Sequence, residues 1–157
     1  LILAPRHVER VNGLEKMFNK EGIKTIRRTN IAEKNKENVI LLNTIGELAQ
    51  IYSIADLVFV GGSMMGKGGH NILEPAAQGK LVFFGPDMFN FKDSSKLLLE
   101  NEVGIQVENW KELENKILYY LNNSHLLYTK GKKAREVILN NRGASQKNVD
   151  LADSILE

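Results

Sequence analysis

The chain has 157 residues, 43% of them apolar and 25% charged, which is ordinary for a globular protein with a hydrophobic core. A formal net charge of +2 gives no indication of a nucleic-acid partner, and the lack of cysteine excludes disulfides and thiolate metal sites. No apolar run has the length of a membrane span and no signal peptide is visible. Because the chain opens on the apolar run Leu1-Ile2-Leu3-Ala4 without an initiator methionine, we expect a fragment of a longer protein.

Short apolar runs alternate with helical patterns along the chain. Strands are predicted at residues 1–4, 23–29, 39–42, 57–60, 81–84 and 104–107. Helices are predicted at residues 8–20, 44–55, 72–77, 92–101, 111–122, 126–141 and 144–156. Fully apolar strands that alternate with helices form parallel sheets covered on both faces. The sequence therefore predicts an α/β fold, a parallel six-stranded sheet with helices on both faces, in a single domain spanning residues 1–157.

A glycine-rich loop follows the fourth predicted strand and ends at a helix start. Its notable residues are Gly61, Gly62, Lys67, Gly68, Gly69, His70 and Asn71. A loop with so little side-chain bulk lets a phosphate approach the free N–H groups and positive end of a helix. The spacing matches neither a dinucleotide fingerprint nor a P-loop, whose lysine precedes Ser or Thr. A flexible connector is the alternative, and we favour a phosphate site.

The helix start itself carries polar residues with two interpretations each. Asn71 is a favourable N-cap residue for the helix. The Glu74 carboxylate would be stabilised by the positive end of the helix dipole. Beside a phosphate, the Glu74 carboxylate would instead accept hydrogen bonds from a ribose. His70 by itself is compatible with an ordinary surface histidine. Lys67 adds a cation to the loop, which would reach a phosphate, a sugar carboxylate or only solvent.

Two further strand ends contribute residues to the same expected edge of the sheet. Arg6 directly follows the first strand, where its planar guanidinium suits either solvent or a phosphate, and His7 follows it. Thr44 followed by Glu47 is typical of a capping box, so a helix is expected to begin there, with Gly46 and Glu47 at its start.

Two other segments give weaker indications of a contact with a partner or a surface. The run Met88-Phe89-Asn90-Phe91 is expected to contribute at least one ring to the core, and an exposed remainder would mark a contact with a partner or second domain. The basic run 130–135 is expected to be a solvated helix face, with contact to an anionic surface as the alternative. No close pair of carboxylates and no metal-ligand cluster is visible, which favours a binding half-site over a complete active site.

The chain resembles the C-terminal domain of 3-deoxy-D-manno-octulosonic acid (Kdo) transferases over essentially its whole length. The resemblance rests on Pro5-Arg6-His7, Gly46-Glu47-Leu48, ADLVFVGGS at 55–63, GGHNILEPAAQGK at 68–80, FGPDMFNF at 84–91 and Asn141-Arg142-Gly143-Ala144. Among these, GGHNxLEPAA followed by FGPxxxNF is the specific part, since the glycines alone would not identify a family.

This resemblance implies a Rossmann-like, donor-binding half of a GT-B glycosyltransferase of lipopolysaccharide biosynthesis. Such enzymes transfer Kdo from CMP-Kdo to a lipid A precursor, with inversion and without a metal or other cofactor. The residues implied to bind the nucleotide-sugar are Arg6, His7, Gly46, Glu47, Gly61, Gly62, Gly69, His70, Asn71 and Glu74. Among them, Arg6 and the helix start would hold the phosphate and Glu74 the ribose.

The resemblance also implies what the chain lacks. The general base and the acceptor surface belong to an N-terminal domain that the chain does not contain, so we expect no catalytic residue here and an inactive isolated fragment. The full-length protein is expected at the cytoplasmic face of the inner membrane, held there by its N-terminal part, and the fragment itself is expected to be soluble. The alternatives are another GT-B enzyme that uses a UDP-sugar, either a transferase or an epimerase, and a non-catalytic nucleotide-binding module.

Overall fold

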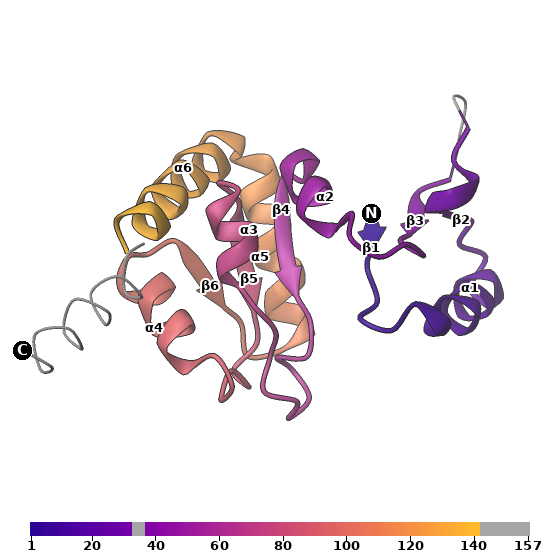
Figure 1. The fold of residues 1–157 in the computed structure, drawn as a ribbon, viewed down its shortest axis with the longest axis horizontal. Helices are drawn as coiled ribbons and strands as arrows, with labels where there is room; N and C mark the ends of the chain where they lie inside the picture. Colours follow the sequence, from indigo (N-terminus) through magenta and orange to yellow (C-terminus); the bar gives the residue numbers. More distant parts are fainter. Residues whose placement is uncertain (33–36, 142–157) are drawn as a thin grey trace, which may run out of the picture. The chain divides into compact units, whose positions relative to one another are not determined.

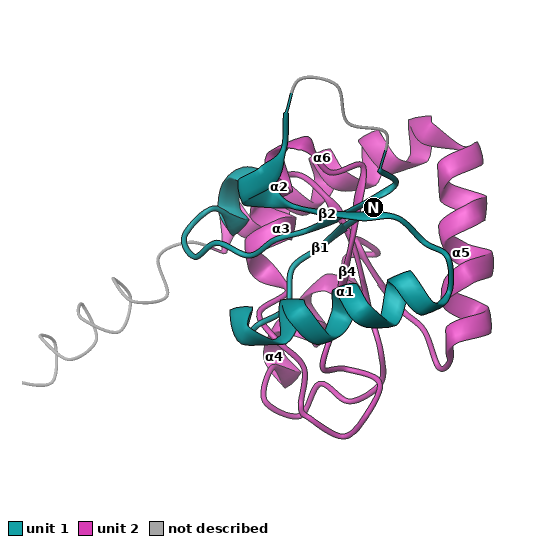
Figure 2. Ribbon diagram, turned by 90° about the vertical axis from the view of Figure 1, so that its right-hand side faces the viewer, with its two compact units in different colours: residues 1–50 teal, residues 51–157 magenta. Residues whose placement is uncertain are grey.

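The structure, a computed structural model, describes residues 1–32 and 37–141. The chain divides into two compact units, residues 1–50 and 51–157, which Figure 2 colours separately. The helix predicted at 144–156 lies outside the described residues. Within the described ranges, no helix combines the length and the apolar character needed to cross a membrane.

The unit of residues 1–50 is a small parallel sheet with one main helix. Its elements are β1 (Ile2–Leu3), η1 (Val8–Arg10), α1 (Val11–Lys20), β2 (Thr25–Arg27), η2 (Arg28–Asn30) and β3 (Val39–Leu41). The strand order is β1-β3-β2, all parallel. The buried side chains of Val11, Val39 and Leu41 form its core. On the sheet's flank, the Arg27 guanidinium donates hydrogen bonds to Glu15 of α1 and lowers the pKa of that carboxyl.

The second unit carries the larger core. Its elements are β4 (Leu57–Val60), α3 (Leu73–Ala77), β5 (Leu81–Phe84), α4 (Lys92–Glu100), β6 (Gly104–Gln106), α5 (Trp110–Asn122) and α6 (Ser124–Asn140), while α2 (Leu48–Ile54) spans the boundary between the units (Figure 1). The strands pair in the order β4-β5-β6, all parallel. The central strand β5 is buried along its whole length, as expected for a parallel sheet covered on both faces.

Alternate residues of β5 face two different clusters. Val82 and Phe84 pack with residues of α3, α4 and α6, whereas Leu81 and Phe83 pack with residues of α5 and the start of α6. This alternation follows from the two-residue period of a strand. The prediction of helices on both faces of a parallel sheet is therefore confirmed for this unit.

The prediction of one six-stranded sheet is wrong, because the strands form two three-stranded parallel sheets. Every pairing in the structure joins strands of the same unit. An apolar run indicates where a buried strand forms, but its hydrogen-bond partner is decided by tertiary geometry that the run does not contain.

The basic run on α6 forms a solvated face, as expected. Lys132, Lys133 and Arg135 are exposed, whereas Gly131 and Ala134 between them are buried. The Lys130 ammonium donates to the Glu102 carbonyl oxygen across the surface. The buried side of α6 lies against the turn between α3 and β5, where an added Cβ at Gly131 would collide with the Gly79 carbonyl oxygen.

Replacing Gly131 with Ala should therefore destabilise the protein, by about 1–3 kcal/mol for an overpacked site, despite alanine's better helix propensity. Gly13 is the matched control, because it also lies in a helix but an added Cβ there has nothing within 4 Å. Gly13→Ala should leave stability unchanged or raise it by up to about 1 kcal/mol. Urea unfolding followed by far-UV circular dichroism measures both, and equal or greater stability of Gly131→Ala would contradict the packing described.

Candidate functional site

The glycine-rich loop, residues 61–71, is held against the loop of residues 85–91 that follows β5. The Asp87 N–H donates to the Ser63 carbonyl oxygen at 2.8 Å, and the Asn90 N–H donates to the Gly68 carbonyl oxygen at 3.2 Å. The Gly66 N–H donates to the Asp87 carboxylate at 2.5 Å. These contacts come from both ends of the second loop, so the two loops form one structure.

Ser63 joins the ends of β4 and β5 at the base of the two loops. Its side chain is fully buried, and its hydroxyl donates to the Val60 carbonyl oxygen at 2.7 Å. The same oxygen accepts a hydrogen bond from the Gly85 N–H at 2.8 Å. An added Cβ at Gly85 would collide with the Ser63 backbone, so this close approach requires glycine at position 85.

Two of the five glycines in this loop are required by packing. Gly68 and Gly69 are buried with φ of +79° and +76°, a conformation that favours glycine. An added Cβ would collide with Phe89 and Asn90 at Gly68, and with the Met88 sulfur at Gly69. The loop is thus packed against its neighbour, unlike a flexible connector, and these two glycines need no ligand to explain them.

The other three glycines lie nearer to open space. Gly62 has φ of +75°, and the His70 ring lies 3.1 Å from where its Cβ would be. Gly66 has φ of +67°, which favours glycine. Gly61 is exposed, has no positive φ, and an added Cβ there has no atom within 4 Å. Among the five, Gly61 is therefore the position that neither packing nor backbone conformation explains, and the Gly61 backbone is open to a ligand.

The N-cap of α3 is Ile72, and not Asn71 as the sequence had suggested, but Asn71 still bonds the first residue of the helix from one position earlier. The Asn71 side-chain oxygen accepts from the Leu73 N–H at 3.0 Å, and its side-chain amide donates to the Glu74 carboxylate at 2.9 Å. Asn71 and Glu74 are both exposed. Asn71 thus fixes the position of a carboxylate at the surface of the loop edge, next to His70.

Tyr52, on α2, is a further residue at this edge that the sequence did not indicate. Burial raises the pKa of its phenol, and the nearby Glu74 carboxylate raises it further. This electrostatic interaction joins two residues that are far apart along the chain and on different helices. No motif or spacing in the sequence pointed to it.

The remaining predicted residues belong to the unit of residues 1–50. Arg6 and His7 are exposed in the turn after β1, and the His7 ring lies 3.3 Å from the Glu9 carboxylate. Gly46 and Glu47 follow β3, the parallel neighbour of β1, so both pairs lie at the same edge of that sheet.

Gly46 and Glu47 do not begin a helix, contrary to prediction. The helix α2 begins at Leu48, because Gly46 has φ of +90°, which a right-handed helix cannot contain. Thr44 donates its hydroxyl to the Glu47 carboxylate, which also lies 3.2 Å from the Arg28 guanidinium. The predicted capping box is therefore a side-chain contact that precedes the helix.

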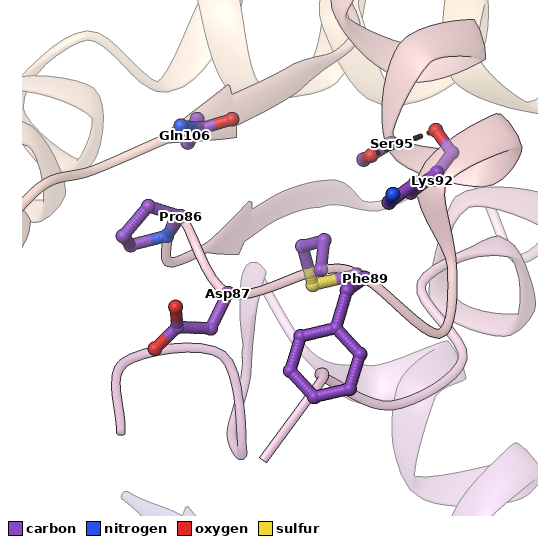
Figure 3. Close-up of a pocket in the computed structure, with 7 residues that line it drawn as sticks. Pro86, Asp87, Phe89, Lys92, Ser95 and Gln106 are labelled. Carbon is purple, nitrogen blue, oxygen red and sulfur yellow. Dashed lines mark hydrogen bonds between the residues drawn. The ribbon is translucent and has the colours of Figure 1, made fainter. Parts of the chain in front are cut away.

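Two cavities lie at opposite edges of the sheet in the second unit. One, of about 340 Å³, lies at the carboxyl edge beside the loop 85–91 and is lined by Pro86, Asp87, Met88, Phe89, Lys92, Ser95 and Gln106 (Figure 3). The other, of about 200 Å³, is lined by residues that precede β4 and β5 and by the start of α6. In the part of the chain that the structure describes, no group of three His, Asp or Glu residues is arranged to hold a metal ion.

Comparison with known proteins confirms the resemblance stated from the motifs. No family model matches the chain. Over its full length it is 38% identical to the 3-deoxy-D-manno-octulosonic acid transferase of Haemophilus influenzae, of which it covers 37%. It is 34% identical over 90% of its length to the corresponding transferase of Rickettsia felis, of which it covers 31%. The chain therefore spans about a third of the length of these curated relatives.

A solved structure is similar to the chain as well. It is the C-terminal CMP-Kdo binding domain of WaaA from Acinetobacter baumannii, with a TM-score of 0.81 and 27% sequence identity. The match covers 87% of this chain and 72% of that one. The chain is thus a homologue of Kdo transferases, with the α/β fold of their C-terminal domain.

Replacing Glu74 with Gln should lower the pKa of the Tyr52 phenol, because removing a nearby negative charge favours the phenolate. Burial, the larger cause, should keep that pKa above the ordinary value. Titration of ¹³C-labelled tyrosine by NMR, with Tyr52→Phe to assign the signal, measures the change. Glu100→Gln on α4 is the control and should leave the signal unchanged, and the same result for Glu74→Gln would disprove the contact.

Proposed function

We propose that this homologue of the Kdo transferases is the C-terminal, donor-binding domain of a two-domain GT-B glycosyltransferase. The donor is CMP-Kdo, and the reaction is the inverting, metal-independent transfer of Kdo to a lipid A precursor in lipopolysaccharide biosynthesis. The observation that carries the proposal is the similarity in fold and sequence to a domain whose own description is CMP-Kdo binding. The Haemophilus influenzae and Rickettsia felis relatives are transferases for the same sugar acid.

The geometry of the second unit supports a nucleotide at the carboxyl edge of its sheet. The open backbone at Gly61 and the ring of His70 border the start of α3, where an anionic phosphate is favoured by N–H groups. Glu74, held by Asn71, offers an exposed acceptor for ribose hydroxyls. In this proposal Arg6, His7, Gly46 and Glu47 contribute from the unit of residues 1–50.

The chemistry asked of these residues is to stabilise a leaving group. Departure of cytidine monophosphate leaves negative charge on a phosphate, and fixed cations and N–H donors stabilise such charge most when they are already in place. The Arg6 guanidinium and the loop backbone supply such groups. The general base and the acceptor surface are assigned to the N-terminal domain, through which the full-length protein would also contact the inner membrane.

Calorimetric titration of the chain with CMP, UMP and UDP tests the identity of the nucleotide. We expect CMP to bind most tightly, because the proposed donor carries a single phosphate and a cytosine. Selective binding of UDP would instead favour a UDP-sugar enzyme of the same fold and would contradict the proposal.

Two substitutions test the position of the site. Glu74→Ala and Arg6→Ala should each weaken CMP binding roughly tenfold, the size of one hydrogen bond to a charged group. The matched controls are Glu114→Ala on α5 and Arg10→Ala on η1, which remove the same charges from exposed positions outside the proposed site. If neither Glu74→Ala nor Arg6→Ala weakens binding beyond its control, the site lies elsewhere.

A further inference from the structure

The cavity at the carboxyl edge shares a wall with the glycine-rich loop. Three of its lining residues contact that loop: Asp87 accepts from the Gly66 N–H, Phe89 packs against Gly68, and Met88 packs against Gly69. Gly69 directly precedes His70 at the start of the predicted phosphate site. The cavity therefore adjoins the glycine-rich loop through Asp87, Met88 and Phe89.

The lining of the cavity suits a hydroxylated acid. In Figure 3, Lys92 and Ser95 at the start of α4 and Gln106 at the end of β6 lie on one side of the loop between β5 and α4, and the Phe89 ring extends from the other side of that loop. The Phe89 side chain is 55% exposed, so its face is available to aliphatic C–H groups. Asp87 has a second carboxylate oxygen besides the one bonded to the Gly66 N–H, and Gln106 has a side-chain carbonyl oxygen, while its amide donates to the Glu108 carboxylate at 3.3 Å. Lys92 supplies a positive charge.

Lys92 differs from the other lysine of its helix. Lys96 pairs with Glu100 one turn away, at 3.8 Å. Lys92 is exposed and has no ion pair with any residue in the described ranges. The Lys92 backbone carbonyl oxygen accepts a hydrogen bond from the Ser95 hydroxyl at 2.9 Å. This bond stabilises the first turn of α4 and does not involve the Lys92 ammonium group.

The size and position of the cavity match the sugar of the proposed CMP-sugar donor. In a CMP-sugar, one phosphate joins the sugar to the nucleoside, so the sugar must lie directly beside the phosphate. A volume of about 340 Å³ is within the range of small-ligand pockets. The sugar of the proposed donor is an acid, so its carboxylate needs a cation at that distance from the phosphate.

We infer that this cavity holds the acidic sugar of the donor and that the Lys92 ammonium pairs with its carboxylate. The inference rests on the proposed function, since it assumes a CMP-linked sugar acid. It assigns Lys92 a role in specificity: the nucleotide is bound by the glycine-rich loop and its surroundings, whereas the sugar acid is distinguished by the cavity.

The test compares CMP with CMP-Kdo as calorimetric ligands of the full chain. Wild-type protein should bind CMP-Kdo more tightly than CMP. Lys92→Met should lower the affinity for CMP-Kdo about tenfold while CMP binding stays within about twofold, as expected for the loss of one charged pair. Lys92→Arg should retain most of the affinity, and Lys96→Met, the matched control, should change neither ligand.

The outcomes separate this inference from the proposed function. If CMP binds but Lys92→Met lowers the affinity for CMP-Kdo no more than Lys96→Met does, the cavity is not the sugar site. The proposed function as a donor-binding domain would remain supported. If Lys67→Met, in the glycine-rich loop, causes the selective loss instead, the carboxylate lies on the other side of the loop and the assignment is wrong. If neither CMP nor CMP-Kdo binds the wild-type chain, the proposed function itself fails.

Discussion

The buried hydroxyl of Ser63 determines where both loops of the candidate site begin. It bonds the end of β4, through Val60, to the start of the next loop, through Gly85. A buried hydroxyl without partners would cost about 1–3 kcal/mol. Keeping both hydrogen bonds therefore fixes the positions of the ends of β4 and β5 relative to each other. From that junction the chain continues into the glycine-rich loop on one side and the loop 85–91 on the other. Their positions, and so the edge that bears His70, Asn71 and the cavity, depend on this bond.

Only some glycines of the loop leave space for a phosphate, because others are required by packing. A glycine-rich loop before a helix is usually taken as space for a phosphate, and Gly61 retains that meaning because it borders open space. Gly68 and Gly69 instead make room for Phe89, Asn90 and Met88. The same contacts that fix the phosphate side of the loop therefore form a wall of the cavity, so nucleotide and sugar recognition would share one rigid structure.

The sequence predicted those parts of the molecule that local pattern decides. β4 and β5 were predicted within their observed bounds because continuous apolar runs suit buried strands, and α5 was predicted from its amphipathic apolar stripe. The partners of the strands, the electrostatic interaction of Tyr52 with Glu74 and the packing role of Gly68 were not predictable, since each depends on residues distant in sequence. The expected helix start at Thr44 was wrong because one backbone angle, at Gly46, overrode a favourable pattern. At least one ring of the run 88–91 was predicted to join the core, and in the structure the partly buried Phe91 packs against it, whereas Phe89 is exposed.

The central claim is that one edge of the second unit, built on the two joined loops, binds the nucleotide of the donor. An NMR titration of ¹⁵N-labelled chain with CMP tests it directly. The account predicts shifts of the amide signals of Gly61, His70 and Glu74, with those of Asp56, Lys80 and Tyr128 around the opposite cavity unchanged. Shifts centred on that opposite cavity, or no shifts at the loop at saturating CMP, would contradict it.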